Sequence, residues 1–156
     1  MELILWRHAE AKDAGPNEAD EDRALTRKGK SDAERMGKWL DSRLPESCRI
    51  LVSPALRTVQ TAQALGRKFK THVSLGPGAT PEHVLAAANW PMAREPVLVV
   101  GHQPTLGLIA STLLANSSQS WRIKRSGVWW IAQQKQGDPS TTFIRAVMAP
   151  DLIGKN

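Results

Sequence analysis

The chain has 156 residues, of which 41% are hydrophobic, and these values favour a single folded domain over residues 1–156 and exclude a disordered chain. No apolar run approaches the roughly 20 residues of a membrane span, so we expect a cytoplasmic protein with no membrane partner. The formal net charge of +6 favours anionic partners, but the basic residues are scattered and form no recognised DNA- or RNA-binding motif, so nucleic acid is not an expected partner.

The first third of the chain begins with a predicted strand. Residues 2–6 form a short, mostly apolar run that ends where charged residues begin, which is typical of a buried strand. Residues 12–24 are polar and contain an acidic cluster from Glu18 to Asp22, so we expect an exposed loop whose acidic side chains face solvent. Residues 27–43 carry apolar side chains at steps of three and four, which predicts a helix capped by Thr26.

The middle of the chain continues this alternation. Residues 49–52 predict a second strand. Ser53-Pro54 then offers a cap and a first-turn proline, so a helix is expected from Ser53 to about Lys68, with a supporting role of Ser53 at a site as the alternative. A weaker strand is predicted at residues 72–75, and Thr80-Pro81 begins a third helix by the same logic.

The last third of the chain holds the strongest strand pattern. Residues 96–100 form a valine and leucine run, and residues 104–115 predict a helix. Two β-rich runs, residues 127–133 and 141–148, predict a hairpin. This order predicts an α/β fold of three layers, with helices on both faces of a mostly parallel, mixed sheet that a β-hairpin closes.

Arginine and histidine side chains follow three of the predicted strands. Arg7-His8 comes after the first strand, Arg57 begins the helix after the second, and His102 comes after the strong fourth strand. Because ligands of open α/β sheets bind at the carboxyl ends of the strands, we expect these side chains to converge. Arginine matches phosphate oxygens with paired donors, and histidine can act as a nucleophile. The pattern predicts a phosphate site, and the lack of a glycine-rich phosphate loop argues against a nucleotide site.

Several segments resemble signatures of the histidine phosphatase superfamily. They are Leu5-Trp6-Arg7-His8-Ala9-Glu10, the run from Ser53 to Ala62, Val100-Gly101-His102-Gln103-Pro104, and Arg23-Ala24-Leu25-Thr26 with Gly29. The resemblance extends over roughly residues 3–148, and the short chain without long insertions is most similar to the SixA-type phosphohistidine phosphatases. It implies the phosphoglycerate mutase-like fold.

The resemblance also implies a role for each of the four residues. His8 would take up the phosphoryl group as a covalent phosphohistidine, and water would then hydrolyse this intermediate. Arg7 and Arg57 would hold the phosphate oxygens, and His102 would stabilise charge on the transferring group. Such a site needs neither a metal nor another cofactor. The second ring nitrogen of His8 is expected on a backbone acceptor, which the sequence does not identify.

An acid that many members of this superfamily carry after the third strand is missing. Aligned on Thr80-Pro81, its position falls on Gly78, and nearby Glu82 is interpreted first as a charge in a first helical turn and second as a possible acid. A phosphohistidine has a nitrogen leaving group, which departs easily once protonated. We therefore expect a phosphohistidine phosphatase that acts on a phosphorylated protein domain. The alternatives are a small-molecule phosphate monoester phosphatase that uses Glu82, and a non-catalytic module that binds phosphate or a phosphoprotein.

Other polar and aromatic residues are interpreted more simply. Glu10 either reaches the site or faces solvent, and a metal site built from His8, Glu10 and His102 is disfavoured because the arginines would repel a cation. The lone Cys48 excludes an intrachain disulfide and is interpreted as a small core residue. The Trp129-Trp130 pair indicates core packing or a contact surface.

Overall fold

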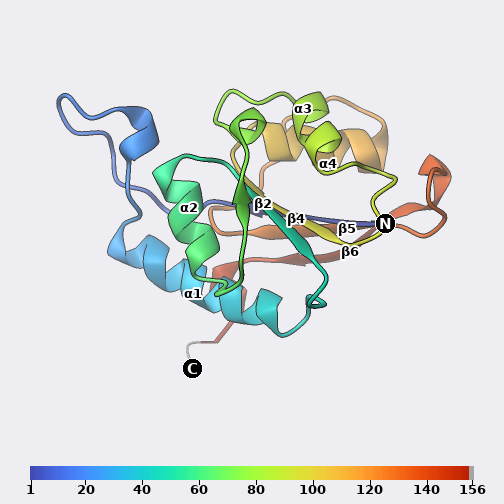
Figure 1. The fold of residues 1–156 in the computed structure, drawn as a ribbon, viewed down its shortest axis with the longest axis horizontal. Helices are drawn as coiled ribbons and strands as arrows, with labels where there is room; N and C mark the ends of the chain where they lie inside the picture. Colours follow the sequence, from blue (N-terminus) through green and yellow to red (C-terminus); the bar gives the residue numbers. More distant parts are fainter. Residues whose placement is uncertain (155–156) are drawn as a thin grey trace.

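A six-stranded mixed sheet forms the middle layer of the fold, and helices cover both of its faces (Figure 1). The structure is a computed structural model that describes residues 1–154. The strands are β1 (Glu2–Arg7), β2 (Arg49–Val52), β3 (Lys70–Thr71), β4 (Val97–Gly101), β5 (Val128–Gln133) and β6 (Thr142–Met148). The helices are α1 (Arg27–Asp41), α2 (Leu56–Gln63), α3 (Pro81–Ala87) and α4 (Thr105–Ala115). The predicted three-layer α/β fold and its closing hairpin are confirmed.

The order of the strands brings the ends of β1, β2 and β4 together. The sheet has the order β3-β2-β4-β1-β5-β6, in which the first four strands are parallel and β5 and β6 are antiparallel to their neighbours. Arg7 of β1 lies opposite Gly101 of β4, and Val52 of β2 lies opposite Val100. Since these parallel strands end at almost the same level, the residues that follow them meet at one edge of the sheet.

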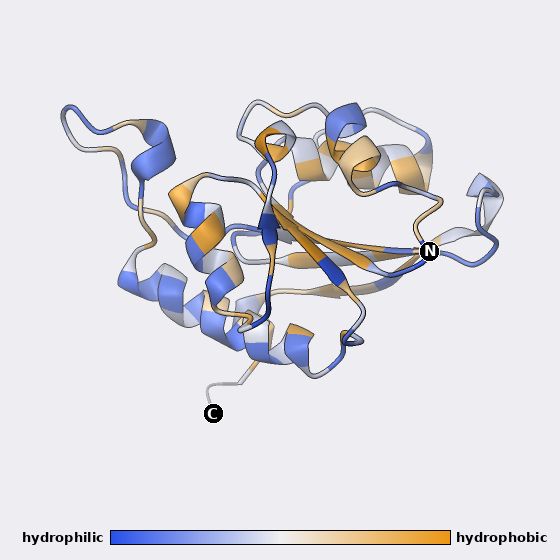
Figure 2. Ribbon diagram, viewed as in Figure 1, coloured by the Kyte–Doolittle hydropathy of each residue, from blue (hydrophilic) through white to orange (hydrophobic). Residues whose placement is uncertain are grey.

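Side chains of the central strands alternate between two hydrophobic cores. In β1, Leu3 and Leu5 belong to the core that α3 and α4 cover, whereas Ile4 and Trp6 belong to the core that α1 and α2 cover. Figure 2 shows the central strands as mostly hydrophobic between the two helical layers. The continuous apolar runs in the sequence therefore reflect a sheet that is buried on both faces.

The start of α1 is tied to the segment that follows β1. Thr26 caps the helix as predicted, because its Oγ1 accepts a hydrogen bond from Gly29 N at 2.9 Å. The backbone N–H of Thr26 donates to Glu10 O at 3.0 Å. Gly29 permits this close approach, since a Cβ at that position would lie 2.1 Å from Glu10 O. The cap therefore positions the residues just after β1 as well as the helix.

The strand predicted at residues 72–75 is wrong. β3 covers only Lys70–Thr71, and residues 73–75 form a 3₁₀ turn. The side chain of His72 accepts a hydrogen bond from Ser74 N at 3.3 Å, and this local bond draws the chain out of the sheet. Leu75, the last residue of the turn, is buried in the core, whereas Val73 is 87% exposed.

The helix predicted from Ser53 to Lys68 is shorter than expected, because α2 begins at Leu56 and ends at Gln63. Ser53 N donates to Val100 O at 3.1 Å, so Ser53 still belongs to the edge of the sheet and not to the helix. Beyond α2, Gly66 adopts a left-handed conformation with φ of 76°, which turns the chain away from the helix axis. The helix therefore presents two turns to the site.

The core interpretation is confirmed for Trp130 and Cys48, but Trp129 is only partly buried. Trp130 is 3% exposed, and Trp129 is half-buried with its ring centroid 5.8 Å from that of Trp121. Cys48 is buried beside α1 and β2, and burial raises the pKa of its thiol to about 11. A thiol of that pKa is a packing group at neutral pH rather than a nucleophile.

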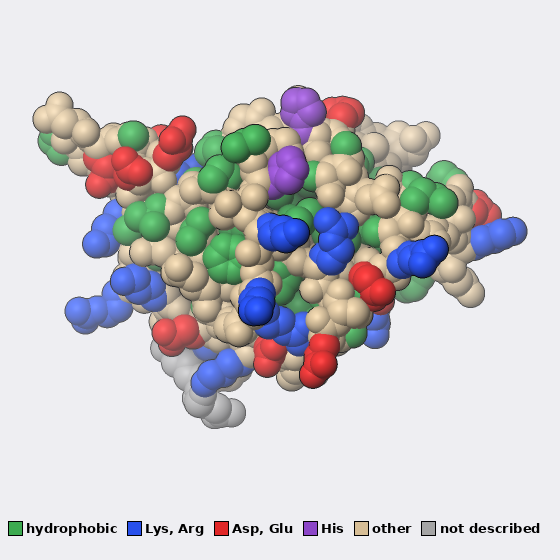
Figure 3. All heavy atoms as spheres, viewed as in Figure 1, with side chains coloured by type: hydrophobic (Ala, Val, Ile, Leu, Met, Phe, Trp, Pro, Cys, Tyr) green, Lys and Arg blue, Asp and Glu red, His purple; other side chains and the backbone are tan. Residues whose placement is uncertain are grey.

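The face shown in Figure 3 carries both basic and acidic side chains, with hydrophobic side chains exposed between them. This agrees with the scattered distribution of basic residues along the sequence. Within residues 1–154, every helix is too short or too polar to cross a membrane.

Candidate active site

Two histidines face each other where β1 and β4 end. His8 directly follows β1 and His102 directly follows β4, and the centroids of their rings lie 5.3 Å apart. The backbone N–H of His8 donates to Gly101 O at 3.1 Å, which continues the parallel pairing of the two strands for one more residue. The register of the sheet therefore brings together residues that are 94 positions apart in the sequence.

A cavity of about 220 Å³ beside these rings holds all four residues singled out from the sequence. Its lining consists of Arg7, His8, Ala11, Arg23, Arg57, Pro77, His102, Gln103 and Arg125. Arg57 reaches it from the first turn of α2 and is 4% exposed. The lining contains four arginines and no carboxylate, so the cavity suits a multiply charged oxyanion. We refer to it as the phosphate pocket.

The His8 ring is held with one nitrogen toward the backbone and the other free. Its Nδ1 lies 2.8 Å from Ala9 O and donates its proton there, so the neutral ring carries its lone pair on Nε2. The N–H of Ala9 in turn donates to Thr61 Oγ1 at 3.0 Å, which ties this turn to α2. Burial, followed by the positive charges of Arg57 and Arg7, lowers the pKa of His8 to about 4, while the bond to Ala9 O opposes this change.

The His102 ring is held by Ser53. Its Nε2 lies 2.7 Å from Ser53 Oγ, and that hydroxyl also accepts a hydrogen bond from Ala55 N at 3.3 Å. The N-cap residue of α2 is Ala55, so the expectation that Ser53 caps the helix gives way to the supporting role. Burial, followed by the proximity of His8, lowers the pKa of His102 to about 3. Nδ1 of His102 is buried and has no hydrogen-bond partner among the described residues.

The acidic cluster from Glu18 to Asp22 is not wholly the solvated face expected from the sequence. Asp20 accepts two hydrogen bonds from the Arg57 guanidinium, at 2.9 Å through its backbone O and 3.0 Å through Oδ2. Arg23 Nη1 donates to the other carboxylate oxygen at 3.0 Å. Hydrogen bonds from Arg23 first, and then from Arg57, hold the pKa of Asp20 below its usual value. The loop thus contributes an ionised carboxylate next to the phosphate pocket.

The two remaining candidate carboxylates lie outside the phosphate pocket. Glu82 is exposed in the first turn of α3, as its simpler interpretation expects, and is not part of the pocket lining. Glu10 accepts a hydrogen bond from Thr26 Oγ1 at 2.9 Å and lies 3.6 Å from an Arg125 nitrogen, so it turns away from the two histidines. Within residues 1–154, no three His, Cys, Asp or Glu side chains are grouped so as to hold a metal ion.

The lowered pKa values of both histidines predict a dependence of stability on pH. In the unfolded chain each ring binds a proton near pH 6.5, whereas in the folded chain it stays neutral down to about pH 4 for His8 and about pH 3 for His102. The unfolded state therefore holds more protons in this window, and the free energy of unfolding falls as the pH drops from about 6.5 toward 4. Above pH 6.5 this contribution to stability is complete.

Urea unfolding of the wild type and of His102→Asn at pH 7, 5.5 and 4.5 checks this expectation. Both proteins lose stability from their other groups, but the variant is expected to lose less between pH 7 and pH 4.5 because one buried neutral imidazole has been removed. Equal losses in the two proteins would contradict the role assigned to burial of His102.

Comparison with known proteins agrees with the fold. The model of the histidine phosphatase superfamily (branch 1) matches residues 3–79. Phosphohistidine phosphatase SixA of Escherichia coli is 31% identical over 123 residues, which cover 72% of this chain and 74% of that protein. The chain therefore belongs to the histidine phosphatase superfamily. Membership of this family supports a phosphatase, a hydrolase that acts on a phosphate-bearing substrate.

Within that superfamily, solved structures of SixA proteins are similar to this chain over nearly its whole length. SixA from Agrobacterium tumefaciens has a TM-score of 0.78 and 26% identity, with 96% of this chain and 98% of that chain covered. The protein histidine phosphatase SixA complexed with tungstate has a TM-score of 0.76 and 26% identity, with 97% and 99% covered. These similarities agree with the phosphoglycerate mutase-like fold expected from the sequence.

Sequence reasoning assigned no role to Thr61, Gln103 or Arg125, and it gave Ser53 a supporting role only as the alternative to a helix cap. Arg125 and Gln103 line the phosphate pocket, and Thr61 and Ser53 orient the turns that carry the histidines. Gln103 directly follows His102, which was the one local signal for it. The other contacts join segments that are far apart in the sequence, so no local pattern reveals them.

Proposed function

We propose that this protein is a phosphohistidine phosphatase, which removes the phosphoryl group from a phosphohistidine of a protein through a covalent intermediate on His8. The observation that carries the proposal is the content of the phosphate pocket: two neutral histidines and several arginines, with no carboxylic acid in its lining. This set can bind and transfer a phosphoryl group but offers little help to an alkoxide leaving group.

In the first step, the lone pair on Nε2 of His8 attacks phosphorus. An Nε2–P bond forms while the P–N bond to the substrate imidazole breaks, and the departing nitrogen takes its proton from water. Arg7 and Arg57 hold the non-bridging oxygens, and Arg57 exchanges the Asp20 carboxylate for phosphate oxygens in doing so. The low pKa of His8 keeps its lone pair free at neutral pH.

In the second step, water attacks phosphorus and His8 leaves as the neutral ring, which releases inorganic phosphate. The hydrogen bond from Nδ1 of His8 to Ala9 O keeps Nε2 directed toward phosphorus in both steps. When the Ser53 hydroxyl donates to Nε2 of His102, the proton of that neutral ring lies on Nδ1, from which the ring can donate a hydrogen bond to a phosphate oxygen. Fixed hydrogen-bond donors thus stabilise the negative charge on the transferring phosphoryl group, and the proposed reaction needs no metal ion.

Three observations favour a substrate with a phosphorus–nitrogen bond over a phosphate ester. Glu82, the one acid considered from the sequence, is exposed and outside the pocket. Asp20 is held ionised by Arg23 and Arg57, so it is a poor proton donor. Similar proteins carry the name phosphohistidine phosphatase, and one of them binds tungstate, a tetrahedral oxyanion like phosphate.

The proposal is tested by measuring phosphate release from two substrates, a phosphohistidine protein domain and glucose 6-phosphate. Each is assayed with and without EDTA. We expect kcat/KM for the phosphohistidine protein to exceed that for the sugar phosphate by about 10²-fold or more, the usual contribution of a missing general acid. EDTA should have no effect. Faster hydrolysis of the sugar phosphate would support the monoester phosphatase, and vanadate binding without turnover of either substrate would support a binding module.

A further inference from the structure

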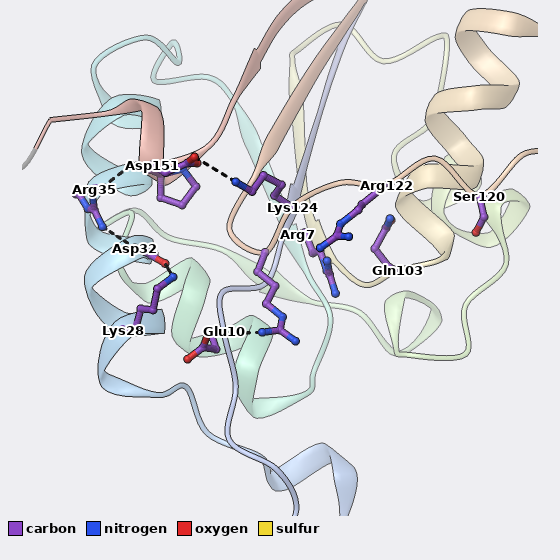
Figure 4. Close-up of a pocket in the computed structure, with 12 residues that line it drawn as sticks. Arg7, Glu10, Lys28, Asp32, Arg35, Gln103, Ser120, Arg122, Lys124 and Asp151 are labelled. Carbon is purple, nitrogen blue, oxygen red and sulfur yellow. Dashed lines mark hydrogen bonds and ion pairs between the residues drawn. The ribbon is translucent and has the colours of Figure 1, made fainter.

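A second, larger cavity of about 790 Å³ adjoins the phosphate pocket. It shares Arg7, Gln103 and Arg125 with that pocket. The rest of its lining consists of Glu10, Lys28, Asp32, Arg35, Ser120, Arg122, Lys124, Pro150 and Asp151. Figure 4 shows Arg7, Gln103 and Arg122 close together on one side of it. We call this cavity the outer basin, because a group bound in the phosphate pocket would have its neighbours there.

The segment that carries Arg122 and Arg125 is fastened directly to the site. The backbone of Ser126 donates to His8 O at 3.1 Å, and the backbone of Arg7 donates to Gly127 O at 3.1 Å. The side chain of Arg7 donates through Nη1 to Ile123 O at 2.9 Å. These bonds hold the backbone of residues 122–127 at a fixed position beside Arg7 and His8.

The beginning of α4 fixes the same segment from its other end. Gln103 Nε2 donates to Trp121 O at 2.8 Å, and Gln103 Oε1 accepts from Gly107 N at 2.7 Å. Gly107 makes room for this arrangement, since a Cβ there would lie 1.9 Å from Trp121 O. The basic side chains of this segment therefore stand on a backbone that the site itself positions, unlike charges on a free surface loop.

Of the six cationic side chains that line the outer basin, three form ion pairs of 3.2 Å or less with carboxylates of the same lining. Lys28 and Arg35 both pair with Asp32, and Lys124 pairs with Asp151. These pairs are drawn as dashed lines in Figure 4.

Arg125 and Arg122 lack a comparably close carboxylate. The contact of Arg125 with Glu10 is long, at 3.6 Å, and Arg122 forms no ion pair with any described residue. Positive charge therefore remains where the outer basin meets the phosphate pocket.

Three guanidinium groups crowd at that junction. Burial, and then the charges of Arg125 and Arg122, lower the pKa of Arg7. Its Nε is buried without a partner among the described residues. A phosphoryl group between Arg7 and Arg57 offsets the charge of those two, which leaves Arg122 and Arg125 to be met by a further anionic group of the ligand.

We infer that Arg122 and Arg125 form an anion subsite that binds aspartate or glutamate side chains of the protein substrate next to its phosphohistidine. This inference rests on the proposed function and names the class of substrate, an acidic segment of a phosphoprotein. The outer basin is several times larger than the phosphate pocket, and its lining combines carboxylates held in ion pairs with Arg125, whose contact with Glu10 is long, and Arg122, which has no ion pair with a described residue. Such a lining complements a chain segment with several side chains better than a single compact anion.

The inference can be tested with two phosphohistidine peptides. One has glutamate on either side of the phosphohistidine, and the other has glutamine at the same positions. The wild type is expected to show a kcat/KM about tenfold higher for the glutamate peptide, a ratio that falls as salt is raised from 50 to 500 mM, as expected from screening of charges in solvent. In the double variant Arg122→Gln/Arg125→Gln the ratio should approach one. Both side chains are exposed, so the fold should persist, which circular dichroism and thermal unfolding check.

Arg94→Gln is the matched control, because it removes the same charge from an exposed arginine just before β4, at the opposite end of that strand from the site. It should leave the ratio at the wild-type value. A wild-type ratio near one, or a ratio that survives the double substitution, would overturn the inference.

Hydrolysis of phosphoramidate, whose P–N bond has no flanking groups, separates this inference from the proposed function. If phosphoramidate and both peptides stay intact, the proposed function fails. If both peptides are hydrolysed at equal rates, the proposed function stands and only the anion subsite is lost.

Discussion

Replacing His8 by Ala is expected to lower kcat for a phosphohistidine substrate by at least about 10⁴-fold, because the proposed intermediate cannot form without the imidazole. No other group in the phosphate pocket can take over this role. His102 is the other imidazole there, but its Nε2 is engaged with Ser53 at 2.7 Å. Steady-state kinetics and acid-labile labelling of the protein with [³²P]phosphohistidine substrate measure the effect, and the label should be missing from the variant.

The variant should still bind an oxyanion such as vanadate, since both arginines remain, and this control shows that the pocket is intact. Retention of a tenth or more of the wild-type kcat would rule out His8 as the nucleophile. Loss of the label with retained turnover would instead indicate direct attack by water.

Replacing Arg57 by Lys is expected to lower kcat/KM by about 10²- to 10³-fold, although the formal charge is kept. The guanidinium enters the phosphate pocket from a buried position and presents two nitrogens side by side, as its paired bonds to Asp20 illustrate. An ammonium group is a single point of charge and cannot reproduce that fork. Binding of vanadate should weaken in parallel with kcat/KM.

Arg94→Lys makes the same exchange on an exposed arginine away from the site and should change neither quantity. A kcat/KM within threefold of the wild type for Arg57→Lys would contradict the paired binding of phosphate by Arg57.

The framework of this site could be predicted from local patterns, because its residues lie where strands end. The apolar runs before His8 and His102 are short and continuous, which is the pattern of strands buried on both faces, and parallel strands place their carboxyl ends together. The same reasoning predicts that Arg57 lies at this edge of the sheet, because it belongs to the first turn of the helix after β2. Even with the start of that helix misplaced by a few residues, Arg57 remained on the correct edge.

The residues that tune the site could not be predicted, because their contacts depend on packing between distant segments. Asp20 was assigned to solvent with its acidic neighbours, yet it meets Arg57 across 37 residues of chain. In the sequence, Arg125 is one scattered basic residue among many, and no motif marks it. Its place beside Arg7 results from the hydrogen bonds that join residues 122–127 to the end of β1. Residues 72–75 resemble a strand in composition, but only Leu75 is buried and the segment forms a 3₁₀ turn instead.

The bonds that join β1 to the region around β5 also have a consequence for how the protein is made. Arg7 and His8 emerge from the ribosome early, whereas Ile123 and Ser126, which hold them, lie more than 110 residues later. Contacts of such long sequence separation form late and slowly in folding. A nascent chain that has released only β1 to β4 therefore carries Arg7 and His8 without the residues that hold them. The site is complete only when β5 and β6 have joined the sheet.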